Sequence, residues 1–345
     1  MNSFFRGLII AGGVGLTAAL AAKAIAERSR WFKYAGKSVI ITGGSRGLGL
    51  VLARQLVDSG ARVAICARTQ PDLESAEAEL KRRGGDVLAI ECDIRDPSNV
   101  ESMVDCVISS FGTVEILFNV AGIIEVGPLD SMKMDDFHDS MNTNCWGALH
   151  TVLAVLPEMR RRGWGRIVNV ASIGGKQALP HLLPYTASKF ALVGLSNGLR
   201  TELAKDGIVV TTVCPTLIRT GSPRNATFKG QHRAEYAWFS IGDSLPNVSM
   251  SAPQAARQIL RACQRGAGEV MITNGTNLGV LFQQLAPDLT TELLGLVNRI
   301  LPEMGGIGQR AARGSESESD LSPSWLTALG DRAAVANNEL RRHPK

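Results

Sequence analysis

Tyr185 and Lys189 lie four residues apart in the segment Tyr-Thr-Ala-Ser-Lys, and Ser172 lies thirteen positions before the tyrosine. A phenol exchanges protons poorly at neutral pH, because its ordinary pKa is about 10. A lysine one helical turn away lies on the same face of a helix, and its positive charge favours the phenolate. This spacing therefore predicts a tyrosine that can pass protons to and from a bound substrate.

The elements that would position these residues begin with an apolar run and a glycine-rich turn. Residues 38–41 (Ser-Val-Ile-Ile) are mostly β-branched and too few for a helix, which predicts a buried parallel strand. The segment Thr-Gly-Gly-Ser-Arg-Gly-Leu-Gly follows at 42–49, and a helical pattern of apolar residues comes after it. Glycines let the backbone approach a pyrophosphate, which the N–H groups of a helix N-terminus attract. The arrangement favours a nucleotide site over an ordinary glycine-rich turn.

At this point the chain resembles the short-chain dehydrogenase/reductase family, in its Thr-Gly-x-x-x-Gly-x-Gly form. The resemblance covers about residues 36–275, in the family's order and spacing. Two residues depart from the family pattern. Val120 stands where the family usually has a second asparagine, and Thr216 stands where a glycine normally follows Pro215. The second departure puts in doubt the path of the loop beside the nicotinamide. The matching residues are Thr42, Gly43, Gly47, Gly49, Asp93, Asn119, Ala121, Gly122, Asn144, Ser172, Tyr185, Lys189, Pro215 and Thr220.

Strand and helix signals alternate along the chain as an α/β doubly wound parallel sheet of the Rossmann type requires. We expect about seven strands, and the resemblance implies the sheet order 3-2-1-4-5-6-7. After the strand at 38–41, the expected strands are 62–66, 87–92, 115–119, 166–171, 208–214 and 269–273. The expected helices after the first are 71–83, 97–111, 133–162, 185–205 and 252–265.

The end of the second strand selects the cofactor. A dinucleotide without a 2′-phosphate is usually held there by an acidic residue, but this chain has Arg68 at that place and Arg46 inside the glycine-rich turn. Two guanidinium groups can grip a phosphate, so NADP(H) is favoured over NAD(H). The alternative is that both arginines are solvated and NAD(H) is bound loosely. Asp93 resembles the family's adenine contact, or else it only ends the third strand.

The resemblance also implies the role of each catalytic residue. Tyr185 would exchange a proton with the substrate oxygen, and Ser172 would hydrogen-bond that oxygen, unless it only terminates a strand. Lys189 would bind the nicotinamide ribose and lower the pKa of Tyr185. Asn144, within a long helix, would hold a water that extends a proton relay to Lys189. The implied cofactor-binding residues are Thr42, Gly43, Ser45, Arg46, Gly47, Leu48, Gly49, Arg68, Asp93, Ile94, Asn119, Ala121, Gly122, Tyr185, Lys189, Pro215, Ile218 and Thr220.

Length and composition set outer limits. The 345 residues exceed the roughly 250 of one doubly wound domain. A net charge of +5, without a run of Lys and Arg among aromatic residues, disfavours nucleic-acid binding. The six cysteines form no Cys-x-x-Cys pair, so neither a metal site nor a disulfide framework is indicated.

The N-terminal segment has a different character. Residues 7–22 carry no charge, and only Lys23 separates them from a further apolar triplet. A helix of this length reaches about 30 Å, the thickness of a bilayer core. Basic residues are more numerous after the segment than before it, so the positive-inside rule places the catalytic domain in the cytoplasm. We therefore expect a membrane anchor at 1–30; a cleaved signal peptide is the alternative.

The sequence after residue 215 says less about the substrate and about the role of each segment. The substrate loop expected at 216–250 contains Phe228, Tyr236, Trp238 and Phe239, which either line an apolar pocket or pack on the body of the domain. Its basic residues either face an acidic head group or are solvated. An apolar helical extension at 276–304 could cover the pocket, touch a membrane surface or pack against a second subunit in a homodimer. We expect a flexible polar tail at 305–345, with an acidic linker and a short helix at 324–341.

Two classes of function are compatible with these features. One is a membrane-anchored NADP(H)-dependent oxidoreductase that interconverts a ketone or aldehyde and an alcohol on a lipophilic substrate, with an NAD-dependent alcohol dehydrogenase as its variant. The other is a non-catalytic dinucleotide-binding interaction protein. Because Ser172, Tyr185 and Lys189 are all present, the enzyme is favoured. Sterol-like or retinoid-like alcohols and long-chain 3-keto lipids are not separated by the sequence.

Overall fold

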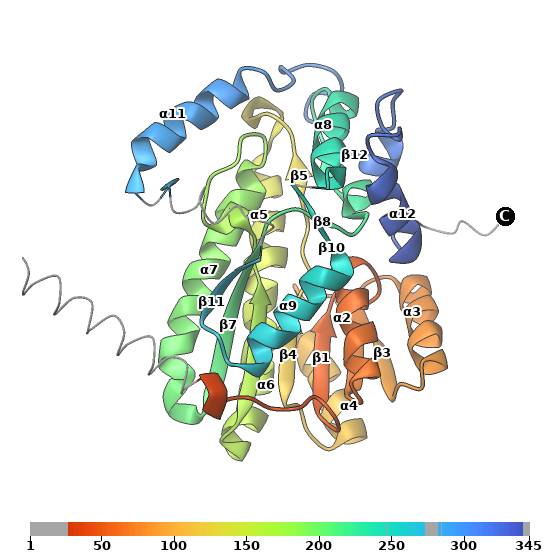
Figure 1. Cartoon of the computed structure of the whole chain (residues 1–345), viewed down its shortest axis with the longest axis vertical. Helices are drawn as coiled ribbons and strands as arrows, with labels where there is room; N and C mark the ends of the chain where they lie inside the picture. Colours follow the sequence, from red (N-terminus) through yellow and green to blue (C-terminus); the bar gives the residue numbers. More distant parts are fainter. Residues whose placement is uncertain (1–26, 247, 273–281, 284, 341–345) are drawn as a thin grey trace, which may run out of the picture.

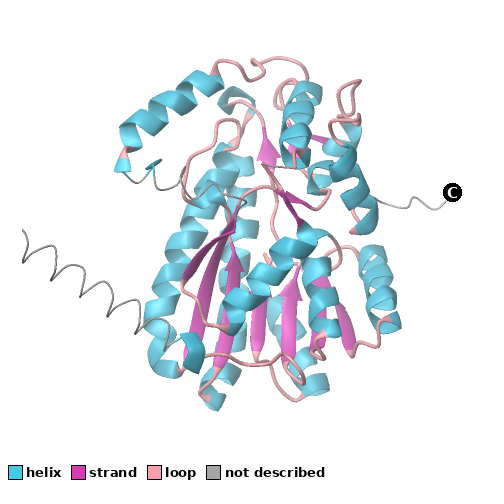
Figure 2. Ribbon diagram, in the orientation of Figure 1, coloured by secondary structure: helices cyan, strands magenta, loops and turns pink. Residues whose placement is uncertain are grey.

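The computed structural model describes residues 27–246, 248–272, 282–283 and 285–340, and a seven-stranded parallel sheet lies at its centre (Figures 1 and 2). The strand order is β3-β2-β1-β4-β6-β7-β11, which confirms the order expected from the sequence. Its strands are β1 (Ser38–Thr42), β2 (Arg62–Ala67), β3 (Val87–Glu91), β4 (Ile116–Asn119), β6 (Gly165–Val170), β7 (Ile208–Pro215) and β11 (Glu269–Ile272).

Helices cover both faces of this sheet, and successive side chains of each strand point to opposite faces. Val39 and Ile41 pack in the hydrophobic cluster of one face, whereas Ile40 packs in the cluster of the other. Burial on both faces explains why the strands read as nearly continuous apolar runs. The first cluster contains residues of α2 (Gly47–Asp58), α3 (Gln70–Arg82) and α9 (Ala252–Gln264), and the second contains residues of α4 (Pro97–Phe111) and α6 (Gly147–Arg162).

The long helix expected at 133–162 is interrupted. The structure has α5 (Met134–Met141), then one π-helical turn (Asn142–Trp146), and only then α6. Such a wide turn inserts an extra residue into a helix and is frequent at functional sites. It contains Asn144, whose side chain bonds to the backbone of Ile123 across the neighbouring loop. The helix containing the catalytic pair, α7 (Leu183–Leu203), is continuous.

The expected substrate loop folds into short elements above the carboxyl ends of the strands (Figure 1). Its aromatic residues mostly pack together: Phe228 and Tyr236 are fully buried, with ring centroids 5.3 Å apart. The buried Lys229 pairs with Asp136 at 2.5 Å rather than facing a ligand. Most of these aromatic residues therefore pack on the body of the domain and do not line an apolar pocket. The elements are β8 (Ile218–Arg219), β9 (Thr227–Phe228), α8 (His232–Ser244) and β10 (Met250–Ser251).

The C-terminal tail differs from the flexible linker expected at 305–345. Its described part, up to residue 340, packs on the catalytic domain, and β12 (Ala312–Arg313) pairs with β9. The helix α12 (Ala328–Ala336) lies beside α8 (Figure 1). Flexibility was expected because the tail has few apolar residues. The structure holds the tail instead by hydrogen bonds and by close backbone packing, as at Gly221, where a Cβ atom would overlap Ala334.

One helix of the extension stands away from the sheet. The helix α11 (Pro287–Asn298) lies at the upper left of Figure 1, and its side chains Leu289, Leu293 and Leu296 are about half exposed. None of the described residues 282–301 lines the main cleft. No helix within the described residues is long and apolar enough to cross a membrane. The anchor expected at 1–30 falls almost wholly on residues 1–26, which lie outside the described part.

Candidate active site

The glycine-rich turn between β1 and α2 forms a bare backbone cradle. Gly43 has φ +67°, and a Cβ atom on it would lie 2.9 Å from Cα of Ala121; on Gly49 a Cβ atom would overlap the carbonyl of Gly43. Side chains are therefore excluded at both positions, and the backbone of the turn leads directly into the N-terminus of α2. Free N–H groups and the helix dipole at such an end attract phosphate. The cradle fits the pyrophosphate of a dinucleotide.

A cleft of about 570 Å³ opens at the carboxyl ends of the strands and runs from this cradle to Tyr185. Ligands of open parallel sheets bind at this edge. Apolar side chains of Ile124, Leu179, Leu182 and Phe239 also line the cleft. The lining contains these residues singled out from the sequence: Gly43, Ser45, Arg46, Gly47, Leu48, Gly49, Arg68, Asp93, Ile94, Ala121, Gly122, Ser172, Tyr185, Lys189, Pro215, Ile218 and Thr220.

Three of the residues singled out from the sequence lie behind the lining: Thr42, Asn119 and Asn144. Oγ1 of Thr42 accepts the N–H groups of Val120 and Ala121, at 3.0 and 3.1 Å, and so ties the turn to the loop after β4. The buried amide of Asn119 donates to Oδ1 of Asn169 at 2.9 Å. Thr42 and Asn119 therefore act through the backbone that they hold, whereas Asn144 reaches the site through its hydrogen bonds.

Tyr185, Ser172 and Lys189 meet at the far end of the cleft. Tyr185 lies in the first turn of α7, and Lys189 lies one turn later with Nζ 5.7 Å from the centroid of the tyrosine ring. Ser172 lies two residues after the end of β6; its side chain is hydrogen-bonded to Tyr185, and its Oγ accepts the N–H of Gly174 at 3.0 Å. Ser172 thus caps a short turn and also contacts the phenol, while its hydrogen bond to a substrate oxygen stays a prediction.

The pKa values differ from the simple expectation that Lys189 lowers the pKa of Tyr185. Burial raises the pKa of the Tyr185 phenol to about 12, and the hydrogen bond with Ser172 opposes this rise. Burial also lowers the pKa of Lys189 to about 8. The amine donates to the carbonyl of Val170 at 3.1 Å rather than to the phenol. Desolvation is the largest cause of both shifts, because it disfavours the charged form of each group.

Asn144 and Lys189 converge on one glycine. A Cβ atom on Gly122 would lie 2.8 Å from Oδ1 of Asn144 and 3.5 Å from Nζ of Lys189. The amide of Asn144 also donates to Oγ of Ser188 at 2.9 Å and bonds Ile123 through both of its polar atoms. These contacts fix the asparagine close to the lysine, where a proton relay would need it. The π-helical turn aims Asn144 at this point.

The other end of the cleft carries the two arginines expected to select the cofactor. Arg68 is exposed at the cleft, close enough to Asp93 to help lower the pKa of that carboxyl. The main cause of the lowered Asp93 pKa is Arg95, which pairs with it at 2.6 Å. Arg46 lies among Asp72 and Glu339, each 3.6 Å from the guanidinium.

Sequence reasoning missed three buried carboxyl groups that line the cleft, namely Glu125, Asp243 and Glu339. Burial raises the pKa of Glu125 to about 7, with nearby Asp136 adding to the rise. Burial likewise raises the pKa of Asp243 to about 8. None of the three stands at a motif position, so no local signal in the sequence could have marked them.

The loop after β7 contains Thr216, which stands where the family normally has a glycine after Pro215. The N–H of Thr216 donates to the carbonyl of Ile272 at 3.0 Å, and its Oγ1 lies 3.4 Å from the same oxygen. The loop is therefore tied to the end of β11 before it enters β8. Thr216 and Leu217 line the cleft beside Pro215.

The fold and this site together define a class of protein. Residues 37–229, more than half of the chain, match the family model described as short chain dehydrogenase. The chain therefore belongs to the short-chain dehydrogenase/reductase family, a family of oxidoreductases.

Several individual members of the family are similar to this chain over most of the catalytic domain. The chain is 38% identical to a putative ketoacyl reductase of Streptomyces coelicolor over 216 residues, which cover 62% of this chain and 82% of the relative. It is 35% identical over 183 residues to the 3-oxoacyl-acyl-carrier-protein reductase FabG of Staphylococcus aureus, covering 53% of this chain and 74% of that protein. A solved structure of an actinorhodin polyketide ketoreductase variant with NADPH is similar with TM-score 0.62 and 31% identity, over 69% of this chain and 96% of the other.

Proposed function

We propose that the protein is an NADP(H)-dependent ketoreductase that interconverts a ketone and an alcohol on a lipophilic substrate. The observation that carries this proposal is the convergence of Ser172, Tyr185 and Lys189 at the end of a cleft that begins at a phosphate cradle. Among the relatives named above, two are described as ketoacyl or 3-oxoacyl reductases, and one structure contains NADPH.

The residues of this chain would divide the work as follows. A bound nicotinamide dinucleotide supplies the hydride. Tyr185, protonated at neutral pH because its pKa is about 12, is in the form that donates a proton to a carbonyl oxygen. Ser172 would hydrogen-bond the same oxygen and fix its position. Lys189 and Asn144 would hold the proton path behind the tyrosine.

The cleft favours long-chain 3-keto lipids over compact polar ketones as substrates. Leu179, Leu182 and Phe239 form an apolar stretch of its lining close to Tyr185 in the hydrophobic cluster. An apolar lining binds an aliphatic chain through the area it removes from water. A turnover screen of the purified protein tests this proposal, with NADPH and NADH against 3-keto lipids, sterol-like ketones and short ketones. Activity restricted to short polar ketones would contradict the substrate class.

Arg68→Asp should weaken NADPH binding and relatively favour NADH. A carboxylate repels the 2′-phosphate and suits a free 2′-hydroxyl, and a charge-assisted hydrogen bond is worth about 1.5–3 kcal/mol. The ratio of kcat/KM for NADPH to that for NADH should therefore fall about tenfold or more. The exposed Arg233, which is outside the cleft lining, offers a matched control. A wild-type protein that already prefers NADH would show that the cofactor assignment is mistaken.

We also propose that residues 7–26 attach the protein to a membrane with the catalytic domain on the cytoplasmic side. Support comes from the sequence alone, from its uncharged stretch and the basic residues that follow. The full-length protein should sediment with membranes and resist high salt and alkaline washing. A chain beginning near Trp31 should lose this attachment and keep cofactor binding. A mature N-terminus near residues 22–25, with the domain outside the cytoplasm, would identify a cleaved signal peptide instead.

A further inference from the structure

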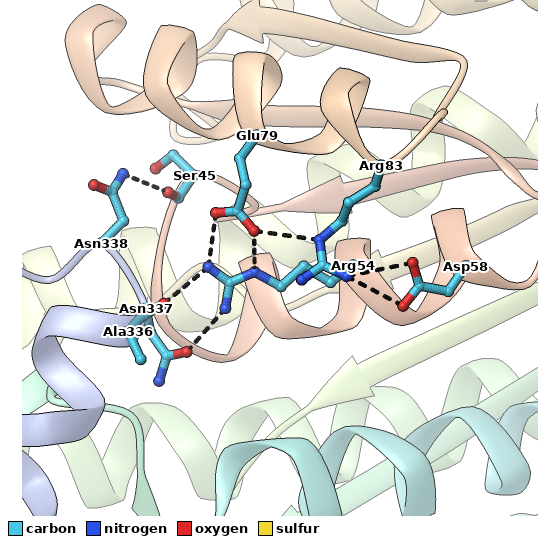
Figure 3. Close-up of polar contacts among 8 residues, drawn as sticks. All are labelled: Ser45, Arg54, Asp58, Glu79, Arg83, Ala336, Asn337 and Asn338. Atoms are coloured by element: carbon cyan, nitrogen blue, oxygen red, sulfur yellow. Dashed lines mark hydrogen bonds and ion pairs between the residues drawn. The ribbon is translucent and has the colours of Figure 1, made fainter.

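The last described residues of the tail lie directly on the glycine-rich turn. The carbonyl of Asn337 accepts the N–H of Gly47 at 2.8 Å. The side-chain amide of Asn338 donates to the carbonyls of Ser45 at 3.0 Å and Asp72 at 3.3 Å, and Figure 3 shows the first of these bonds. Because Gly47 begins α2, its N–H is one of the groups that the helix offers to a phosphate. The tail already uses that group.

Glu339 places a carboxylate at the same position. Its side chain is only 3% exposed, and a Cβ atom on Gly47 would lie 2.5 Å from its Oε1. Its Oε2 lies 3.6 Å from Nε of Arg46 and accepts from the amide of Asn225 at 2.6 Å. An anion over a helix N-terminus and beside an arginine has the environment that a bound phosphate requires. The carboxyl group thus lies at the end of the cleft where the glycine-rich turn would bind a phosphate.

The docking of this segment is specific. Arg54 of α2 donates to the carbonyl of Ala336 at 2.8 Å and to Oδ1 of Asn337 at 3.1 Å (Figure 3). Glu79 of α3 holds the same guanidinium with two hydrogen bonds, at 2.6 and 2.8 Å. The amide of Asn337 also donates to the carbonyl of Thr220, a residue of the cleft lining. Two helices and the loop after β8 therefore hold the tail in one place.

We propose that Glu339 is an internal competitor for a cofactor phosphate: the segment Asn337–Glu339 closes the phosphate end of the cleft in the cofactor-free protein, and a phosphorylated dinucleotide displaces it. The inference rests on the proposed function, since it requires that the cleft bind such a dinucleotide. Displacement would free both the N–H of Gly47 and the guanidinium of Arg46. The tail would thereby set the affinity of the enzyme for its cofactor.

The charge state of Glu339 supports a contact that can be displaced. Burial raises the pKa of Glu339 to about 7; Asp72 adds to the rise, while Arg46 and the hydrogen bond from Asn225 oppose it. Asp243, also buried in the cleft, feels the charge of Glu339, which raises its own pKa further. The ionised carboxylate is therefore held at a cost in free energy, which its release to solvent recovers.

Titration of the full-length protein with NADPH, followed by nicotinamide fluorescence, tests the proposal directly. Glu339→Ala removes the competing anion and should lower the Kd for NADPH by about tenfold, the change expected for one charge-assisted contact. Glu339→Gln keeps the size of the side chain and should give a smaller decrease. Asp320→Asn removes the same charge from an exposed tail position outside the cleft lining and should leave the Kd unchanged.

Hydrogen exchange in the wild-type protein gives an independent measurement. Saturating NADPH should increase exchange at residues 336–340, because the N–H groups of Asn337 and Glu339 bond to Ala333 and Ala334 in a helix end that the turn would no longer hold in place. An unchanged or higher Kd in Glu339→Ala, or exchange at 336–340 that NADPH leaves unchanged or decreases, would overturn the proposal. If neither the wild type nor Glu339→Ala binds NADPH or NADH, the proposed function fails instead, and the inference fails with it.

Discussion

Replacing Tyr185 with Phe is expected to lower turnover by a factor of at least about 100 while leaving NADPH affinity nearly unchanged. The substitution removes one hydroxyl, the group proposed to give its proton to the carbonyl oxygen, and keeps the ring that packs beside Lys189. The burial that raises the pKa of this phenol to about 12 keeps the proton on it at neutral pH. Steady-state kinetics with a ketone substrate and a fluorescence titration with NADPH measure the two quantities separately.

A second tyrosine provides the control. Tyr34 is buried away from the cleft, and its hydroxyl donates to the carbonyl of Leu260 at 2.9 Å. Tyr34→Phe therefore removes an equivalent hydroxyl and should cost about 1 kcal/mol of stability without slowing turnover. Comparable turnover in Tyr185→Phe and the wild type would refute the proton-donor role.

Lys189→Ala should reduce both NADPH affinity and turnover, because the lysine is assigned to the nicotinamide ribose and to the proton path. Loss of a charged hydrogen-bond donor predicts an affinity about tenfold lower, and loss of a proton-transfer group predicts a rate about 100-fold lower. The lysine is 4% exposed, so Lys189→Met, which fills more of the space, separates the lost charge from the cavity.

The neighbouring Lys176 allows a matched comparison. It follows the short turn that Ser172 caps, but it pairs with Glu269 at 2.9 Å and lies outside the cleft lining. Lys176→Ala should leave both parameters within about twofold of the wild type. If Lys189→Met retains wild-type affinity and rate, the lysine is only a structural element of α7.

The sequence was sufficient to recognise the strands and most of the residues that line the cleft, and the resemblance to the family implied the order of the strands. Strands such as 38–41 are buried on both faces, so their apolar runs are recognisable without knowledge of the partners. Tyr185 and Lys189 meet because one helical turn separates them, which is a local property. Gly49 is required by close approach to Gly43 within a single turn, and a turn of this kind is visible in the sequence, whereas Gly43 is required by its approach to the distant Ala121.

Only the tertiary structure decided the features that depend on distant partners or on burial. The π-helical turn at Asn144 has the same residue pattern as a regular helix, and its width shows only in the backbone. The high pKa of Tyr185 arises from desolvation, which exists only once the cleft is formed. The tail is rich in polar residues before the short helix expected at 324–341, so its sequence indicated mobility and showed no partners for residues 336–339. Their partners lie in α2, in α3 and in the glycine-rich turn, and hydrogen bonds to backbone carbonyls and N–H groups leave no pattern in the sequence of either segment.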